Sequence, residues 1–249
     1  MALQVGIQLY SVRDETEKDF IGTLEAIAAM GYQGVEFAGY GGLEAEELKG
    51  HLDRLGLRAI ASHTSLEQIN NNLDESIRYN LAIGSQAIIC PMTTFSSKED
   101  WLAIVDQLQR AGEACRTAGI GFGYHNHAHE FVMFDGKYAL DLLYELASPE
   151  HVQAEIDTCF VQMVGLDPIA YLLKYAGRCR LLHLKDWVPG KTNGTIEVGY
   201  GVLDIPGIVA AARQSDVQWL IVEQEEFERP SLTSAKMSLD YLRQHDLLL

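Results

Sequence analysis

The sequence LLHLKD at residues 181–186 is a short apolar run that turns polar at its C-terminal end. Three other segments share this pattern, namely GFGYHNHAHE (121–130), VQAEID (152–157) and WLIVEQE (219–225). Helix-like stretches separate the four segments, and parallel strands need such crossover connections. Because the carboxyl ends of parallel strands meet at one rim, the pattern predicts that polar side chains from all four segments gather there. This arrangement favours an enzyme.

Strand-like runs alternate with helical patterns along the whole chain. We expect strands at residues 5–10, 34–38, 58–63, 86–91, 120–127, 152–157, 179–186 and 217–224. Apolar residues between them recur at helical spacing, as in 20–31 and 101–119, and a glycine follows each stripe. Eight strand–helix pairs in 249 residues predict a (β/α)8 TIM barrel, with residues 1–249 as a single domain. A doubly wound open sheet is the alternative, but no GxGxxG motif follows the first expected strand.

Composition limits the classes of partner. The net charge of −16 opposes binding to nucleic acid or to an anionic membrane, because such binding needs Lys and Arg. The four cysteines form no CxxC pair, so we expect reduced thiols rather than a disulfide framework. No apolar stretch reaches the roughly 18–20 residues of a membrane helix, and the N-terminus lacks the features of a signal peptide. We therefore expect a cytoplasmic protein.

Three residues at the ends of the expected strands are candidate metal ligands. Asp157 closes an apolar strand, His183 lies between two leucines, and Glu223 follows three apolar residues. Taken singly, Asp157 has the alternative of a helix N-cap and His183 that of a hydrogen-bonded core histidine. Glu223 is harder to explain without a partner cation, because carboxylates are almost never buried unpaired. Together the three ligand types suit one divalent ion, Mn²⁺, Zn²⁺, Co²⁺ or Mg²⁺.

The fifth expected strand offers two candidates for a fourth ligand. His125, His127 and His129 alternate, so a regular strand points all three side chains the same way. Glu130 has the opposite parity and reaches the same centre only if the chain bends after His127. We favour Glu130 as the ligand and keep His125 as the alternative. His127 is then the candidate general base or acid, because an unligated imidazole titrates near neutral pH.

Further polar and aromatic residues at the same strand ends are candidates for substrate binding. They are His63, Lys185, Glu36 and Trp187. Lys185 shares the inward face of His183 and could steady a substrate oxyanion, while Glu36 could accept substrate hydroxyl bonds or pair with Lys185. The glycine-rich stretch 188–204 is long for a loop, and we interpret it as a flap over the site. A plain surface insertion is the alternative.

These motifs resemble the sugar phosphate isomerase/epimerase family, whose members have the xylose isomerase-like TIM barrel. The resemblance covers essentially the whole chain and includes YHNHAHEF (124–131), DTCF (157–160), HLKD (183–186) and VEQE (222–225). Its relatives include inosose dehydratases, ketose 3-epimerases and 3-keto-glycoside lyases. The resemblance implies that Asp157, His183 and Glu223 are metal ligands. Many epimerases have a glutamate where this chain has His125, and the HxH pattern is more similar to the dehydratase and lyase branches.

The resemblance further implies metal-assisted enolisation of a small carbohydrate. A base removes a proton next to a carbonyl, and the fate of the enediolate decides between isomerisation, epimerisation and dehydration. We expect His127 as the principal proton-transfer residue, Glu223 as a second one and His125 as a further candidate. Competing hypotheses are a DNA-repair endonuclease, a non-catalytic sugar-binding barrel and a scaffold subunit. The substrate and the oligomeric state stay open, although homo-oligomers are common among these relatives.

Overall fold

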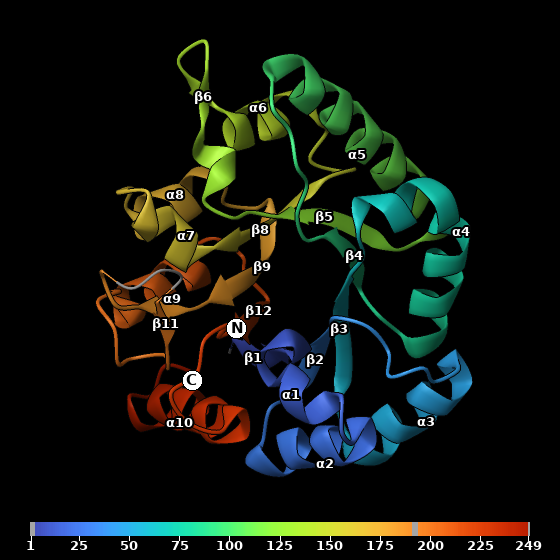
Figure 1. The fold of residues 1–249 in the computed structure, drawn as a ribbon, viewed down its shortest axis with the longest axis vertical. Coiled ribbons are helices and arrows are strands. Elements are labelled where there is room, and N and C mark those ends of the chain that lie inside the picture. The colour runs from blue at the N-terminus through green and yellow to red at the C-terminus, as the bar shows by residue number, and fades with distance from the viewer. Residues whose placement is uncertain (1–2, 191–193, 249) are drawn as a thin grey trace.

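The computed structural model describes residues 3–190 and 194–248, which contain a closed barrel of eight parallel strands (Figure 1). The strands are β1 (Gln4–Gln8), β2 (Gly34–Phe37), β3 (Arg58–His63), β4 (Ala87–Cys90), β5 (Gly121–His125), β8 (Gln153–Asp157), β9 (Cys179–Leu184) and β12 (Trp219–Val222). The first strand pairs with both β2 and β12, so the sheet has no free edge. The predicted (β/α)8 barrel is confirmed, and the open-sheet alternative is wrong.

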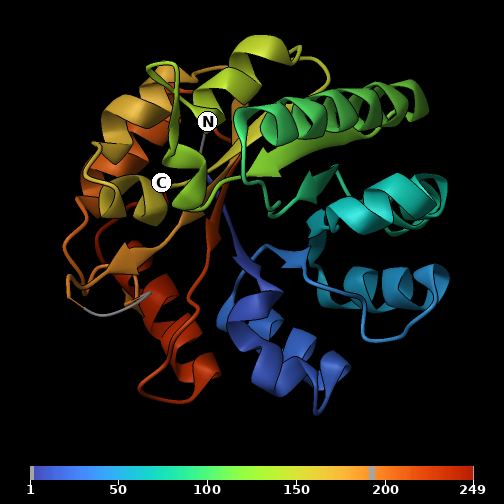
Figure 2. The same cartoon turned by 45° about the horizontal axis from the view of Figure 1, so that its top comes forward.

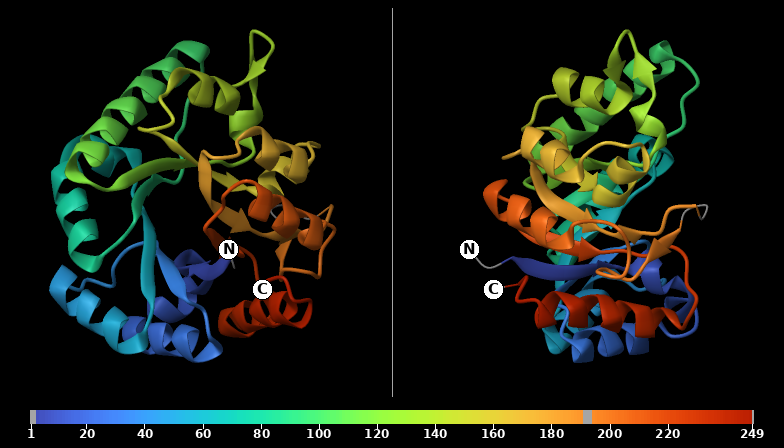
Figure 3. Two further views of the ribbon diagram at one scale, coloured as in Figure 1. Left: turned by 180° about the vertical axis from the view of Figure 1, so that it is seen from behind. Right: turned by 90° about the vertical axis from the view of Figure 1, so that its left-hand side faces the viewer.

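Helices surround the barrel on its outside, as Figures 2 and 3 show from different sides. They are α1 (Arg13–Thr16), α2 (Phe20–Met30), α3 (Ala45–Leu55), α4 (Leu66–Ile83), α5 (Lys98–Ala118), α6 (Ala139–Leu146), α7 (Thr158–Met163), α8 (Pro168–Lys174), α9 (Ile205–Gln214) and α10 (Ser231–Gln244), with the 3-10 turns η1 (Leu9–Val12) and η2 (His129–Phe131). Their apolar faces pack on the outward side chains of the strands and form the main core. This two-layer arrangement leaves the inside of the barrel for the remaining side chains.

Local sequence signals fix the helix ends. The Asp19 side chain accepts a hydrogen bond from the backbone of Gly22 and so caps the first turn of α2. The same helix ends at Gly31, whose φ of 98° is left-handed and suits a residue without a Cβ atom. The glycine stop was expected from the sequence, and the helix ends at Met30, one residue before the end of the expected 20–31.

The interior of the barrel is divided into an apolar plug and a polar upper part. The plug consists of Ile60, Ala61, Ala87, Ile89, Leu181, Trp219 and Ile221. Above it, toward the C-terminal ends of the strands, the inward residues become charged, for example His183 two residues after Leu181. Side chains alternate between the two faces of a strand, so every second residue points into the barrel. Where these inward residues change from apolar to charged, the charged groups lie at the mouth.

Two small antiparallel sheets project from the rim. One joins β6 (Met133–Phe134) to β7 (Lys137–Tyr138), and the other joins β10 (Asp186–Trp187) to β11 (Thr195–Ile196). The strand β11 belongs to the stretch 188–204, so part of the expected flap is a short hairpin. Residues 191–193 of that stretch lie outside the described residues, and the flap function stays a prediction.

Two further expectations concern the chain as a whole. All four cysteines are buried free thiols, as expected from their spacing. Among the described residues, no helix combines the length and the apolar character that crossing a membrane requires.

Candidate metal centre at the mouth of the barrel

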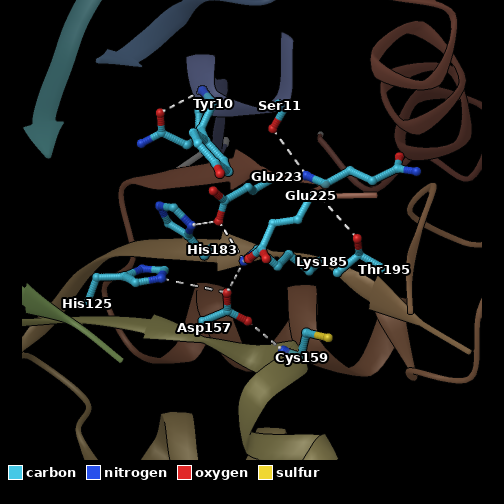
Figure 4. A network of polar contacts seen from close by, with 12 residues as sticks. Tyr10, Ser11, His125, Asp157, Cys159, His183, Lys185, Thr195, Glu223 and Glu225 are labelled. Atoms are coloured by element: carbon cyan, nitrogen blue, oxygen red, sulfur yellow. Dashed lines mark hydrogen bonds and ion pairs between the residues drawn. The ribbon is translucent and has the colours of Figure 1, made fainter. Parts of the chain in front are cut away.

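Four neighbouring strands deliver His125, Asp157, His183 and Glu223 to one place inside the barrel mouth (Figure 4). Each residue offers one ligand atom, and these four atoms lie within 4.8 Å of one another. All four side chains are buried. The strands β5, β8, β9 and β12 are consecutive around the barrel, which explains why residues nearly 100 positions apart converge. The expected gathering of polar strand ends on one rim is confirmed.

Asp157 is both a helix cap and a member of the cluster. Its Oδ1 accepts hydrogen bonds from the backbone of Cys159 at 2.8 Å and of Phe160 at 3.3 Å, which caps α7. Its Oδ2 faces the barrel, 2.8 Å from Lys185 Nζ and 3.9 Å from His125 Nε2. The N-cap interpretation and the ligand interpretation are therefore compatible, because each uses a different oxygen.

The His183 ring links the cluster to a deeper layer. Its Nδ1 lies 2.8 Å from Glu223 Oε2, and its Nε2 lies 2.6 Å from Glu36 Oε2. Burial raises the pKa of Glu223, but Lys185 and His183 outweigh it and hold that pKa well below its ordinary value. Glu223 is therefore an anion at neutral pH, as a metal ligand must be.

Lys185 is fully buried among carboxylates. Its ammonium lies 2.8 Å from Asp157 Oδ2, 2.7 Å from Glu223 Oε2 and 2.6 Å from Glu225 Oε1. Burial lowers its pKa, but the carboxylates outweigh burial and raise it well above the ordinary value. The expected role of Lys185 at a substrate oxyanion is revised, because the ammonium is occupied by protein carboxylates and does not line the pocket.

The strand-five prediction is corrected in one respect, since the described structure does not bring Glu130 to the cluster. The strand β5 ends at His125, and the chain turns into η2, which contains Glu130. The Glu130 carboxylate accepts hydrogen bonds from the Tyr124 hydroxyl at 2.6 Å and from the His127 backbone at 2.8 Å. It belongs to neither group of residues that could hold a metal ion, whereas His125 belongs to both. Of the two predicted candidates, His125 is the one that lies in the cluster, and its role as a ligand stays a prediction.

His127 lines the pocket and packs on Phe160, with ring centroids 4.7 Å apart. Burial and the charge of Lys185 lower the pKa of His127 to about 3. The expected titration near neutral pH is therefore revised for the metal-free chain, in which His127 is a neutral imidazole with low affinity for protons. Glu130 holds the backbone of His127 and so acts on this residue rather than on a metal ion.

A deeper polar layer contains Glu36, Glu155 and the ring of His63. Glu36 and Glu155 are fully buried, so the expected contact of Glu36 with a substrate is revised. Glu36 instead contacts His63, with the ring Nε2 of His63 3.2 Å from Glu36 Oε2. Sequence analysis missed Glu155, although it precedes Asp157 by two residues and so shares its inward face.

A pocket of about 670 Å³ opens above the cluster. It is lined by Tyr10, Ala38, Gly39, Tyr40, His63, Thr64, Ser65, Gln68, Ser76, Pro91, Met92, His125, His127, Glu223 and Glu225. The expected substrate contact of His63 is compatible with this position. Trp187 is not part of this lining and lies in β10, so the structure gives no support to its predicted contact with a substrate.

The cluster fits a divalent cation by its chemistry. It presents two imidazoles and two carboxylates, the donor types that Mn²⁺, Zn²⁺ and Co²⁺ accept in proteins. The buried carboxylates Glu36, Glu155, Asp157 and Glu223 face the ammonium of Lys185 and the imidazoles of His63 and His183, whose pKa values the carboxylates raise. A divalent ion at the cluster would replace the proton on the ring nitrogen of His183 that faces it.

Residues 24–245 match the family described as Xylose isomerase-like TIM barrel, and the chain belongs to this family. An inosose dehydratase of Geobacillus kaustophilus is 31% identical over 164 residues, which cover 57% of this chain and 52% of that protein. The chain thus matches about half the length of this curated relative.

Solved structures show the same fold over the whole length of the chain. A sugar phosphate isomerase/epimerase from Parabacteroides distasonis superposes with a TM-score of 0.86 at 25% identity and covers 99% of this chain and 100% of its own. The IOLI protein with a bound zinc atom has a TM-score of 0.78 at 12% identity, with coverage of 99% and 98%. This second likeness shows the fold alone.

Proposed function

We propose that the chain is a divalent-metal-dependent enzyme that removes a proton next to a carbonyl group of a sugar or sugar derivative. The convergence of His125, Asp157, His183 and Glu223 below an open pocket carries this proposal. These four residues would hold the ion, and His125 takes the fourth position in place of Glu130. When bound, a divalent ion acts as a Lewis acid toward substrate oxygens, which favours enolisation.

Two residues that line the pocket would transfer protons to and from the substrate. His127 lies on the pocket wall and would accept the proton from carbon, a role that contributes roughly 10²–10⁴-fold. Glu223 also lines the pocket and would be a second proton-transfer group while ligating the ion. The return of the proton to another carbon or to the opposite face gives an isomerase or epimerase.

A dehydratase or lyase on a keto-inositol or 3-keto-glycoside is the second candidate. His125 lies where many epimerases have a glutamate, and this departure favours histidine-based proton transfer. The inosose dehydratase relatives support the same branch. The enediolate would then expel a β-hydroxyl or a glycosyl oxygen instead of being reprotonated.

One experiment tests both candidates. Purified protein is incubated in D₂O with Mn²⁺ and a panel of ketoses, inososes and 3-keto-glycosides. The reaction is then quenched, the paramagnetic Mn²⁺ is removed, and the products are analysed by proton NMR. We expect deuterium at the carbon next to the carbonyl in at least one substrate, with elimination products identifying the second candidate. Binding of a sugar without exchange or turnover would instead indicate a non-catalytic sugar-binding barrel.

A further inference from the structure

A second polar layer lies below the candidate ligands, on the side of the apolar plug. It contains Glu36 and Glu155, which are fully buried, and the His63 ring, whose side chain is 12% exposed. Removing a carboxylate from water costs free energy that only hydrogen bonds or a counter-charge recover. One oxygen of each carboxylate, Oε1, has no hydrogen-bond partner among the described residues. Two such groups in one layer need an explanation.

The first part of the explanation is the orientation of His183. Its Nδ1 faces Glu223 Oε2 at 2.8 Å, and its Nε2 faces Glu36 Oε2 at 2.6 Å. A neutral imidazole carries one proton, and a nitrogen that binds a metal ion must present its lone pair. Both distances suit an N–H group that donates to a carboxylate. When a metal ion binds, Nδ1 would release its proton toward the outer cluster, whereas Nε2 would keep its proton for Glu36.

The two nitrogens of His125 also face different carboxylates. Its Nδ1 lies 3.2 Å from Glu155 Oε2, a close approach without hydrogen-bond geometry, and its Nε2 lies 3.9 Å from Asp157 Oδ2. Each of the two imidazoles therefore faces a deep carboxylate with one nitrogen and an outer carboxylate with the other. Metal-binding histidines commonly donate their second N–H group to a carboxylate in this way.

His63 joins the two deep carboxylates. Its Nε2 lies 3.2 Å from Glu36 Oε2 and 3.0 Å from Glu155 Oε2. One nitrogen of His63 thus reaches both carboxylates and holds them together. Gln8 donates a further hydrogen bond to Glu36 Oε2 at 2.8 Å.

We propose that Glu36 and Glu155 are positioning residues that fix which nitrogen of His183 and His125 faces the metal ion. This inference rests on the proposed function and deepens it. An anionic acceptor holds the imidazole proton on the inner nitrogen and makes the outer nitrogen a better ligand. His63 keeps both carboxylates in place without contacting the ion.

A competing explanation is that the deep layer itself holds an ion. His63, His125, Glu155 and His183 form a second group whose ligand atoms lie within 4.8 Å of one another. That ion would need the inner lone pairs of His125 and His183, and the outer cluster would then have no imidazole lone pair left. The two arrangements are mutually exclusive, so metal binding can distinguish them.

The test compares Glu36→Gln and Glu155→Gln with wild type by titration calorimetry with Mn²⁺ and by elemental analysis. Glutamine keeps the size of the side chain but removes its charge. Glu197→Gln is the matched control, because Glu197 is a buried carboxylate bound to Arg229 and Ser234 away from the pocket. We expect one ion per chain throughout, about 10–100-fold weaker binding in each of the two test variants, and unchanged affinity in the control.

Nitrogen NMR of ¹⁵N-histidine protein loaded with Zn²⁺ gives a second readout on wild type, independent of whether a variant folds. We expect the proton on Nε2 of His183 and on Nδ1 of His125. Unchanged affinity in folded test variants, or metal bound to the inner nitrogens, would overturn the inference while leaving a metal enzyme intact. A wild-type chain that binds no metal would refute the proposed function and the inference together.

Discussion

The ammonium of Lys185 lies 2.7 Å from Glu223 Oε2 in the interior of the barrel, where Lys185 is completely buried. A buried charge that loses its partner destabilises a protein strongly, by about 3–5 kcal/mol. Lys185 also contacts Asp157 and Glu225, so it neutralises several carboxylates at once. It is therefore a structural cation of the candidate metal centre.

The first prediction concerns the loss of this cation. Lys185→Met should lower the free energy of unfolding of the metal-free protein by about 3–5 kcal/mol, because buried carboxylates remain unneutralised. Added Mn²⁺ should recover more stability in this variant than in wild type, since the ion replaces the missing charge. Thermal and urea unfolding measure both effects. Lys98→Met, which removes an exposed pair with Asp135, is the control and should cost less than about 1 kcal/mol.

The second prediction concerns Asp157. Asp157→Asn should lose metal retention, because the amide replaces an anionic ligand at the cluster. The barrel should stay folded, since asparagine is as good an N-cap as aspartate and can keep the bonds to Cys159 and Phe160. Elemental analysis and circular dichroism measure the two outcomes. Full metal content in the folded variant would refute the ligand assignment, and Asp19→Asn controls for a cap without a site.

The third prediction separates His125 from Glu130. His125→Gln should lose the metal ion, because it removes a ligand whose Nε2 faces Asp157. Glu130→Gln should keep the ion and instead lower turnover, because the carboxylate holds the backbone of His127. Metal content and substrate deuterium exchange measure the difference. The reverse result would restore Glu130 as the strand-five ligand.

The fourth prediction concerns His127. His127→Gln should retain the metal ion and lose solvent exchange at the substrate carbon by roughly 10²–10⁴-fold. The reason is that this imidazole lines the pocket but belongs to neither group of candidate ligands. Deuterium incorporation in Mn²⁺-loaded protein measures the loss. Wild-type exchange in the variant would transfer the role of base to another residue.

The fifth prediction is a pH dependence of stability in the metal-free protein. The pKa of His63 is about 9 in the folded chain against an ordinary value of 6.5, so its contribution is complete below pH 6.5 and is lost as pH rises through 9. The free energy of unfolding should fall by up to about 3 kcal/mol over this interval. Urea titrations at several pH values measure the slope. His63→Asn should reduce the slope and leave the part that comes from His183, whose pKa the carboxylates also raise. An unchanged slope would contradict the pairing of His63 with Glu36 and Glu155.

Several residues of the site were predictable because their position depends only on where a strand ends and on which of its faces the side chain lies. Asp157, His183 and Glu223 end apolar strands, and parallel strands bring such ends together whatever the loops do. Glu155 was also predictable, because it precedes Asp157 by two residues in the same strand and therefore lies on the same inward face. The role of Glu130 was not predictable, since it depends on how the chain turns after His125.

The sequence by itself determined the alternation of strands and helices, the barrel and the identity of the residues at its mouth. These features follow from periodicity, caps and glycine stops, which act over a few residues. Only the tertiary structure decided that Lys185 contacts the carboxylates of the cluster, that Glu36 and Glu155 lie beside His183 and His125, and that His125 rather than Glu130 lies in the cluster. Such pairings join residues as far apart as Glu36 and His183, and no local pattern specifies which buried charge meets which.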